Sequence, residues 1–228
     1  MDKSYLESVV VQFKYNKSLG DKTFNQLTKE ELFWQFNNES NSIGTLVKHI
    51  SGNMLSRWTN FLTEDGEKSW RNRYDEFVNT FKSKQELIDS WEKGWQCLFN
   101  GLDEINENNK NTIVYIRNQG HTIPEAINRQ LCHYSYHIGQ IVVFGKMVKN
   151  KNWENLSVPK GASKAYNAEK FIKKAIDSVL NQSFSNFEFL IADDASNDKT
   201  KKIIESYNDL RIKRFHNNKN LGYLKTWN

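Results

Sequence analysis

Residues 122–141, TIPEAINRQLCHYSYHIGQI, carry the signals that decide the fold of most of the chain. They begin with Thr122 in a position to cap a helix, followed by Pro124 in the first turn and Glu125 three residues after the cap. This pattern is a capping box, in which the threonine oxygen and the glutamate side chain satisfy backbone N–H groups at the start of a helix. Apolar residues then recur at helical spacing as far as about Lys149. The stretch therefore predicts one long helix with a buried face.

Three further helices are expected before this one. Apolar and aromatic side chains recur every three or four residues in residues 3–27, 42–62 and 84–104, and that period is typical of a helix with one buried face. The segment TIVYI, residues 112–116, is instead expected to be a short strand or extended segment. Four long helices joined by loops of moderate length predict a mainly α fold, an antiparallel four-helix bundle.

The composition narrows the classes of partner. Of the 228 residues, 38% are hydrophobic and 26% are charged, and no window approaches the roughly 18 apolar residues of a membrane span. The first residues include an acid at Asp2 and only a brief apolar run, which is not the pattern of a signal peptide. The net charge of +5 is interleaved with acids and forms no one-sided basic stripe. We therefore expect a cytoplasmic protein that binds neither a membrane nor a nucleic acid.

The two cysteines, Cys97 and Cys132, are too few for a disulfide framework and lack CxxC spacing. We expect both to be reduced, buried thiols. Cys132 precedes His133, but adjacent residues of a helix point about 100° apart. The thiol is therefore a poor candidate for a metal ligand beside that histidine.

His133 and His137 lie four residues apart, so one helical turn places both imidazoles on the same side. Such a pair can chelate one metal ion, as in the HExxH helix, although the glutamate of that motif is absent here. A third ligand must come from another helix, and His49, at the edge of the inner face of residues 42–62, is the natural choice. On spacing alone, the alternative is a pair of core imidazoles hydrogen-bonded to glutamine or tyrosine.

Polar residues near these histidines could orient the imidazoles. Asn53, Tyr134 and Gln140 each lie one turn from a histidine or beside the apolar face. Ordinary polarity of a helix surface is the alternative for each of them. Asp75 and Glu76, in the loop before residue 84, are available carboxylates, but the sequence assigns neither of them the role of general base.

The two histidine-containing segments resemble a known family. SIGTLVKHISGNMLSRW, residues 42–58, followed by HYSYHIGQI, residues 133–141, is similar to the DinB/YfiT-like superfamily. The resemblance covers about residues 1–164 and includes the WRNR loop and the closing SVPKGASKAYN. In that family, one histidine of the second helix and a His-x-x-x-His pair of the fourth helix bind a divalent metal inside a four-helix bundle.

The resemblance implies a ligand set and a chemistry. The metal, most readily zinc or nickel, would be held by His49, His133 and His137. Three neutral imidazoles leave a coordination position for water or substrate. The family implies a metal-dependent transferase or hydrolase that acts on a small molecule, with a low-molecular-weight thiol as a possible co-substrate, and it implies a homodimer. The alternative is a non-catalytic module whose metal is structural or adventitious.

The pattern of the chain changes near residue 165, so two domains are expected, residues 1–164 and residues 165–228. The second part alternates helical and strand patterns, at residues 168–181, 187–196, 199–207 and 211–215. Such alternation is typical of a parallel α/β sheet.

This second part resembles the start of a family 2 glycosyltransferase of the GT-A fold over about residues 166–228. The resemblance implies that Asp193 and Asp194, with Asp198 in the following loop, contact the nucleotide of a sugar donor. Ligands of open α/β sheets do bind at the carboxyl ends of strands. LSVPKGASKA stands in place of the family's opening strand, and no metal-binding Asp-x-Asp motif follows within the sequence. We therefore expect a truncated fragment without transferase activity of its own. It is joined to the first part near YNAEKF by a gene fusion, a rearrangement or an assembly error.

Overall fold

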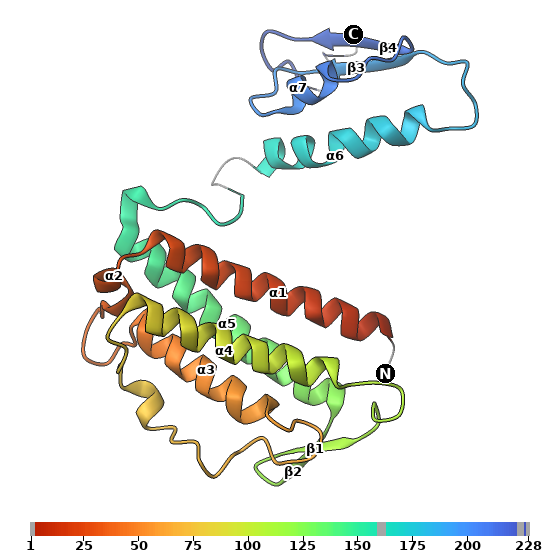
Figure 1. Ribbon diagram of the computed structural model, residues 1–228. Coiled ribbons are helices and arrows are strands. Elements are labelled where there is room, and N and C mark those ends of the chain that lie inside the picture. Colours follow the sequence, from red (N-terminus) through yellow and green to blue (C-terminus); the bar gives the residue numbers. More distant parts are fainter. Residues whose placement is uncertain (1–2, 159–162, 223–225, 227–228) are drawn as a thin grey trace. The chain divides into compact units, whose positions relative to one another are not determined.

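The computed structural model describes residues 3–158, 163–222 and 226 (Figure 1). The chain divides into two compact units, Met1–Leu156 and Ser157–Asn228. Among the described helices, none is both long enough and apolar enough to cross a membrane.

The first unit is an antiparallel four-helix bundle, as predicted. Its long helices are α1 (Lys3–Gln26), α3 (Ile43–Trp58), α4 (Lys84–Asp103) and α5 (Ile123–Lys149). A short helix, α2 (Lys29–Phe33), follows α1, and a single 3-10 turn, η2 (Asn150–Asn152), follows α5. Helix α1 packs against α5, and α3 packs against both α4 and α5, so the four long helices lie side by side (Figure 1).

The helix ends follow local chemistry. The capping box at Thr122 is confirmed, because the Thr122 hydroxyl accepts from the Glu125 N–H at 3.3 Å and the Glu125 carboxylate accepts from the Thr122 N–H at 2.8 Å. Helix α3 ends at Trp58, four residues earlier than expected. Asn60 has a φ of 50°, a left-handed conformation that a continuing helix does not contain and that asparagine adopts more readily than most residues.

One hydrophobic core fills the bundle. Its largest fully buried side chains include Phe13 of α1, Trp91 and Trp95 of α4, and Tyr134 of α5. The Phe13 ring lies 6.3 Å from that of Trp95 and 6.1 Å from that of Tyr134, measured between ring centroids. Because Tyr134 is fully buried, the neighbouring His133 lies at the edge of the core, where it is half-buried.

The same helix shows why one expectation about the cysteines was wrong. Cys132 is exposed and Cys97 is only half-buried. On α5, residue 132 precedes the buried Tyr134 by two positions, and residues two apart on a helix point to nearly opposite sides. The burial of Tyr134 therefore turns the Cys132 thiol away from the core.

A hairpin joins α4 to α5. Strand β1 (Ile113–Ile116) and strand β2 (Gln119–Thr122) pair antiparallel, with Ile113 opposite Thr122. The first strand was expected from TIVYI, whereas the second was not. Arg117 and Asn118 form the two-residue turn and both have positive φ, 55° and 60°, which is the geometry that the right-handed twist of a hairpin favours.

The second unit has the predicted α/β character. It contains α6 (Ser163–Leu180), β3 (Phe189–Asp193), α7 (Thr200–Glu205) and β4 (Ile212–His216). Strands β3 and β4 are parallel, with Phe189 opposite Ile212 and Asp193 opposite His216. Within the described residues its buried core consists of four isoleucines, Ile176, Ile191, Ile204 and Ile212.

Candidate metal centre

The three histidines named from the sequence converge in the bundle. His49 comes from α3, and His133 and His137 come from adjacent turns of α5. The Nε2 atom of His133 lies 3.3 Å from Nε2 of His49 and 3.2 Å from Nε2 of His137. The ligand atoms that the three residues offer all lie within 4.8 Å of one another.

Acceptor groups behind two of the imidazoles fix their tautomers. The Nδ1 atom of His49 lies 3.0 Å from a carboxylate oxygen of Glu76, and Nδ1 of His137 lies 3.1 Å from the side-chain carbonyl oxygen of Gln140. A carboxylate and an amide oxygen only accept, so each Nδ1 carries the proton and donates it. In the neutral ring, Nε2 then presents a lone pair. Both of these lone pairs lie beside Nε2 of His133.

The three rings cannot satisfy one another. A neutral His133 can place at most one proton on Nε2, so at least one of the two neighbouring lone pairs receives no hydrogen bond from it. A divalent cation accepts from all three nitrogens. Separations of 3.2 and 3.3 Å also suit imidazoles that share one ion at about 2.0–2.1 Å from each nitrogen. The residues present therefore fit a metal, and the cluster could hold a divalent ion.

Burial favours the neutral, ligating form of the two imidazoles on α5. Burial lowers the pKa of His133 to about 3, and the nearby His137 and His49 lower it further when they are charged. Burial also lowers the pKa of His137, against a hydrogen bond from its ring to Gln140. Neutral imidazole is the form that binds a metal, so both rings of α5 are available as ligands at neutral pH.

Glu76 supports the site, and the sequence did not distinguish it from Asp75. It lies in the 3-10 turn η1 (Asp75–Phe77) of the loop between α3 and α4, and its side chain is 7% exposed. Besides His49, it accepts from Nε and Nη2 of Arg71 at 2.7 and 2.8 Å. Although burial opposes its ionisation, the hydrogen bonds from Arg71 and His49 lower the pKa of Glu76. The signal available in the sequence was the WRNR cluster, which places Arg71 five residues before it.

The other two candidate orienting residues have a different role. The Tyr134 hydroxyl donates to Asn53 Oδ1 at 3.0 Å and accepts from Trp58 Nε1 at 3.2 Å. Burial raises the pKa of Tyr134, so the hydroxyl keeps its proton. In the described part of the chain no hydrogen bond joins either Tyr134 or Asn53 to an imidazole. Together they tie α5 to α3, whereas Gln140 contacts a histidine as expected.

A cavity of about 390 Å³ opens onto the histidines. It is lined by the three imidazoles, Asn53, Gln130, Phe77 and the side chains of five arginines. The Phe77 ring stacks on His49, with 4.8 Å between ring centroids. The cavity is large enough for a small molecule to reach the imidazoles.

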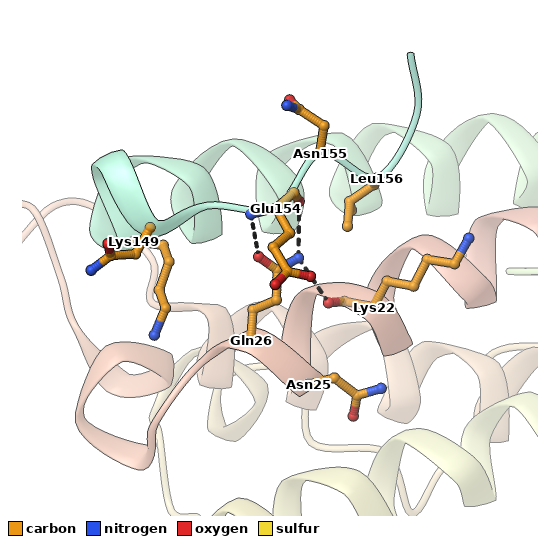
Figure 2. A pocket seen from close by; sticks show the side chains of 8 residues that line it. Lys22, Asn25, Gln26, Lys149, Glu154, Asn155 and Leu156 are labelled. Atoms are coloured by element: carbon orange, nitrogen blue, oxygen red, sulfur yellow. Dashed lines mark hydrogen bonds between the residues drawn. The ribbon is translucent and has the colours of Figure 1, made fainter. Parts of the chain in front are cut away.

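A larger cavity, of about 480 Å³, lies elsewhere in the bundle, beside α1 and the segment after α5. Figure 2 shows Gln26 of α1 hydrogen-bonded to the backbone of Glu154. The Gln26 amide accepts from the Glu154 N–H at 2.8 Å and donates to its carbonyl at 3.1 Å. These contacts fasten the end of the bundle, and the cavity contains no part of the histidine cluster.

The two aspartates named in the second unit lie at the carboxyl end of β3 and bind neighbouring parts of the chain. Asp193 is buried and lies 3.2 Å from Nδ1 of His216. The Asp194 carboxylate accepts from Asn217 Nδ2 and from the backbone N–H groups of Leu221 and Gly222, each at 2.8 Å. The backbone hydrogen bond from Leu221, followed by that from Asn217, lowers the pKa of Asp194 to about 2. Contact of either aspartate with a nucleotide stays a prediction.

The bundle and its three converging imidazoles define a class of protein, the DinB-like four-helix bundles. The family described as "Protein of unknown function (DUF1572)" matches residues 1–162. The chain belongs to this DinB-like family.

The family "Glycosyl transferase family 2" matches residues 164–228, so a fragment of a second family follows the bundle. The C-terminal part is similar to an "Uncharacterized glycosyltransferase" of Haemophilus influenzae, at 39% identity over 66 residues, 28% of this chain and 20% of that protein. It is also similar to the UDP-Glc:alpha-D-GlcNAc-diphosphoundecaprenol beta-1,3-glucosyltransferase WfgD of Escherichia coli, at 43% identity over 53 residues, 23% of this chain and 21% of that protein. The chain spans about a fifth of the length of these relatives. No solved structure matches the chain significantly.

Proposed function

We propose that the bundle binds a divalent metal, zinc or nickel, through His49, His133 and His137, and that it is a metal-dependent transferase or hydrolase of a small molecule. One observation carries the metal-binding part of this proposal. Two imidazoles, held as Nδ1–H tautomers by Glu76 and Gln140, present lone pairs beside the third, within hydrogen-bonding distance of it.

The chain's own residues would prepare the site for chemistry. Glu76 and Gln140 hold two imidazoles in position, and the stacked Phe77 covers one face of His49. The chemistry that a divalent ion supplies at such a site is a lowered pKa of a bound water or thiol. The cavity of about 390 Å³ has room for a small substrate. A low-molecular-weight thiol as co-substrate belongs to the proposal because the DinB-like resemblance implies it.

The test is metal analysis of the purified chain beside the variants His49→Ala, His133→Ala and His137→Ala. Each variant should retain little metal, because two remaining imidazoles chelate far more weakly than three. His121→Ala is the matched control, since it removes an imidazole from β2, outside the cluster, and it should retain metal as the wild type does. Full metal content in the three cluster variants would contradict the proposal.

Removal of the metal by chelation distinguishes a metal-dependent enzyme from a non-catalytic module with a structural metal. If the metal serves catalysis, its removal should leave the helical circular dichroism intact, because the aromatic core of the bundle holds the helices together without it. Loss of the helical signal on chelation would instead favour a structural metal. The role of a thiol co-substrate is tested in the same preparation. Consumption of a model electrophile is measured with and without an added low-molecular-weight thiol.

A further inference from the structure

Arginine and lysine are distributed differently in the bundle. The sequence contains seven arginines among its 32 basic residues, and five of them fall within Met1–Leu156. All five line the cavity at the histidines, and they are Arg57, Arg71, Arg73, Arg117 and Arg129. None of the described lysines of this unit lines that cavity. The cavity is thus lined by arginine and not by lysine, whereas randomly distributed surface charge would place both kinds of basic side chain there.

Two glutamates hold three of these arginines in place. Arg71 donates twice to Glu76, while Arg57 Nη2 and Arg117 Nε both donate to the same oxygen of Glu67, each at 3.0 Å. Within the described chain neither glutamate lines the cavity itself. Five guanidinium groups against these two glutamates and the nearby Asp65 leave an excess of positive charge beside the histidines.

The remaining two arginines have no partner of their own. Arg73 and Arg129 are exposed at the cavity, and neither forms a hydrogen bond or an ion pair with any residue that the structure describes. A structural role therefore accounts for three of the five arginines but not for these two. Their side chains are available to a ligand.

Buried polar atoms at the cavity also lack partners. They are Nε of Arg57, Nη1 of Arg71 and Oε1 of Gln130. The Arg71 side chain is only 2% exposed, so bulk water does not compensate its free N–H groups. A buried donor without a partner is unfavourable and uncommon in folded proteins. A ligand with acceptor atoms would satisfy the N–H groups of Arg57 and Arg71, whereas the Gln130 oxygen would accept from a donor.

The hairpin holds Arg117 at the cavity in an uncommon backbone conformation. Its φ is 55°, which is unfavourable for a residue with a long side chain. The Asp65 carboxylate accepts from the backbone N–H groups of Arg117 and Asn118, at 2.9 and 2.7 Å, and thereby stabilises the turn. The fold thus maintains a strained turn that places a guanidinium at this cavity.

Guanidinium groups select a particular ligand chemistry. Their N–H donors form a planar fork that matches two oxygens of a carboxylate or phosphate, whereas lysine acts as a compact point charge. We propose that the cavity is an oxyanion-binding site in which Arg71, Arg73 and Arg129 bind the carboxylate or phosphate of the small molecule. That this molecule is the substrate rests on the proposed function, whereas the anion site itself requires no metal.

The test is calorimetric titration of the full chain, stripped of metal by chelation, with inorganic phosphate at low ionic strength. We expect saturable binding that the double variant Arg73→Gln/Arg129→Gln weakens by at least about tenfold, since each charge-assisted hydrogen bond contributes about that factor. Both side chains are exposed and without partners among the described residues, so the variant should keep the wild-type circular dichroism.

A charge-matched control is available on the same bundle. Lys14→Gln/Lys93→Gln removes two positive charges from exposed positions on α1 and α4, and it should bind phosphate as the wild type does. Equal weakening in both double variants would overturn the proposal, because it would indicate a general effect of net charge. Absence of saturable binding of both phosphate and succinate at tens of millimolar would overturn it as well.

Succinate in a parallel titration distinguishes the two kinds of oxyanion. Tighter binding of succinate would identify the ligand's anionic group as a carboxylate, and tighter binding of phosphate would identify it as a phosphate ester. The arginine variant should weaken the binding of either anion. The same titrations separate this proposal from the metal proposal. If the chain as purified, before chelation, contains no metal and binds none when it is added, while its anion binding depends on the arginines, the anion site stands and the proposed function is overturned. If instead anions bind only to the metal-loaded chain and the arginine variant binds them as the wild type does, the anion site is overturned and the proposed function stands.

Discussion

Glu76 makes two contacts that depend on each other. One carboxylate accepts from Nδ1 of His49 and from two nitrogens of Arg71, with all three side chains nearly buried. Because Arg71 keeps the carboxylate ionised, Glu76 remains an acceptor and His49 keeps its proton on Nδ1. The tautomer that exposes the Nε2 lone pair of His49 is thus set by Glu76 and, through it, by Arg71, which lies on the same loop between α3 and α4.

Replacing this carboxylate should weaken metal binding without removing a ligand. Glu76→Gln should lower metal affinity by about 10–100-fold, as loss of a partner behind a ligating histidine does in other proteins. It should also destabilise the fold by about 3 kcal/mol, because the buried Arg71 loses its counter-charge. Competition with a chromogenic chelator measures the first effect, and urea unfolding measures the second.

The neighbouring carboxylate provides the control for that variant. Asp75 is exposed and accepts from Asn72, so Asp75→Asn should change neither metal affinity nor stability. Similar losses in both variants would show that Glu76 acts only through the charge of the loop.

At the scale of single residues, the sequence was sufficient to name the three histidines. It identified only some of their hydrogen-bond partners. The spacing of His133 and His137 fixes their common face, and Gln140 lies one turn from His137 on the same helix. Glu76 reaches His49 through a loop whose path depends on Arg71, and no periodic pattern encodes such a path. Tyr134 was named for its position, but its hydroxyl bonds to Trp58 and Asn53.

Among the elements, helix α3 approaches the loop closely at one glycine. A Cβ atom built on Gly52 would lie 2.5 Å from the Glu76 carboxylate oxygen Oε1 and 3.0 Å from its Cδ atom. The absence of a side chain at this point lets the loop carboxylate lie against α3, one turn from His49. The glycine thus sets the distance between the loop and the histidine cluster.

Gly52→Ala should therefore displace Glu76 and weaken metal binding severalfold while every ligand remains. Glycine to alanine within a helix normally stabilises it by up to about 1 kcal/mol, so the free energy of unfolding should fall little. Gly139→Ala is the control, because its Cβ would have nothing within 4 Å, and it should raise stability without altering metal affinity. Chelator competition and urea unfolding compare the two, and an unchanged affinity in Gly52→Ala would contradict this view of the loop.

The elements themselves were largely predictable. The capping box and the apolar periodicity located α5, and β1, β3 and β4 fell where the strand patterns indicated. The end of α3 was misplaced because the left-handed conformation of Asn60 has no strong sequence signal. Strand β2, with the sequence QGHT, was missed because it has little β propensity and pairs only through the turn at Arg117 and Asn118.

For the whole molecule, the two units differ in how much core they possess. The bundle is built around many buried apolar residues, including several tryptophans and phenylalanines. The described residues of the second unit bury four isoleucines, and its two strands pair only with each other. Two strands with a small core give little independent stability.

Hydrogen exchange should therefore separate the units. We expect slow exchange for the core-facing turns of α3, α4 and α5, and exchange that is faster by at least about tenfold across β3, α7 and β4, since amide protection follows local opening free energy. Mass spectrometry of peptides from the full chain at neutral pH measures both in one sample. Equal protection in the two units would contradict a weakly held second unit.

The sequence also indicated that two structurally different parts meet within one chain, because their periodicities differ. A helical period dominates the first part, and an alternation of short helices and strands dominates the second. The arginine cavity was not foreseen, since its five members are distributed from residue 57 to residue 129. Only the packing of α3, α5, the loop and the hairpin brings them together.

The histidines and several of the other cavity residues lie on different kinds of element, and this has an evolutionary consequence. The imidazoles lie on α3 and α5, which also build the core, whereas Arg71, Arg73 and Phe77 lie on the connecting loop. Sequence change in that loop could alter which molecules the cavity admits, provided that a carboxylate remains at Glu76. Relatives with the same three histidines could thus differ in the molecules that the cavity admits by exchange of a single surface segment, while the helices that fold the bundle stay unchanged.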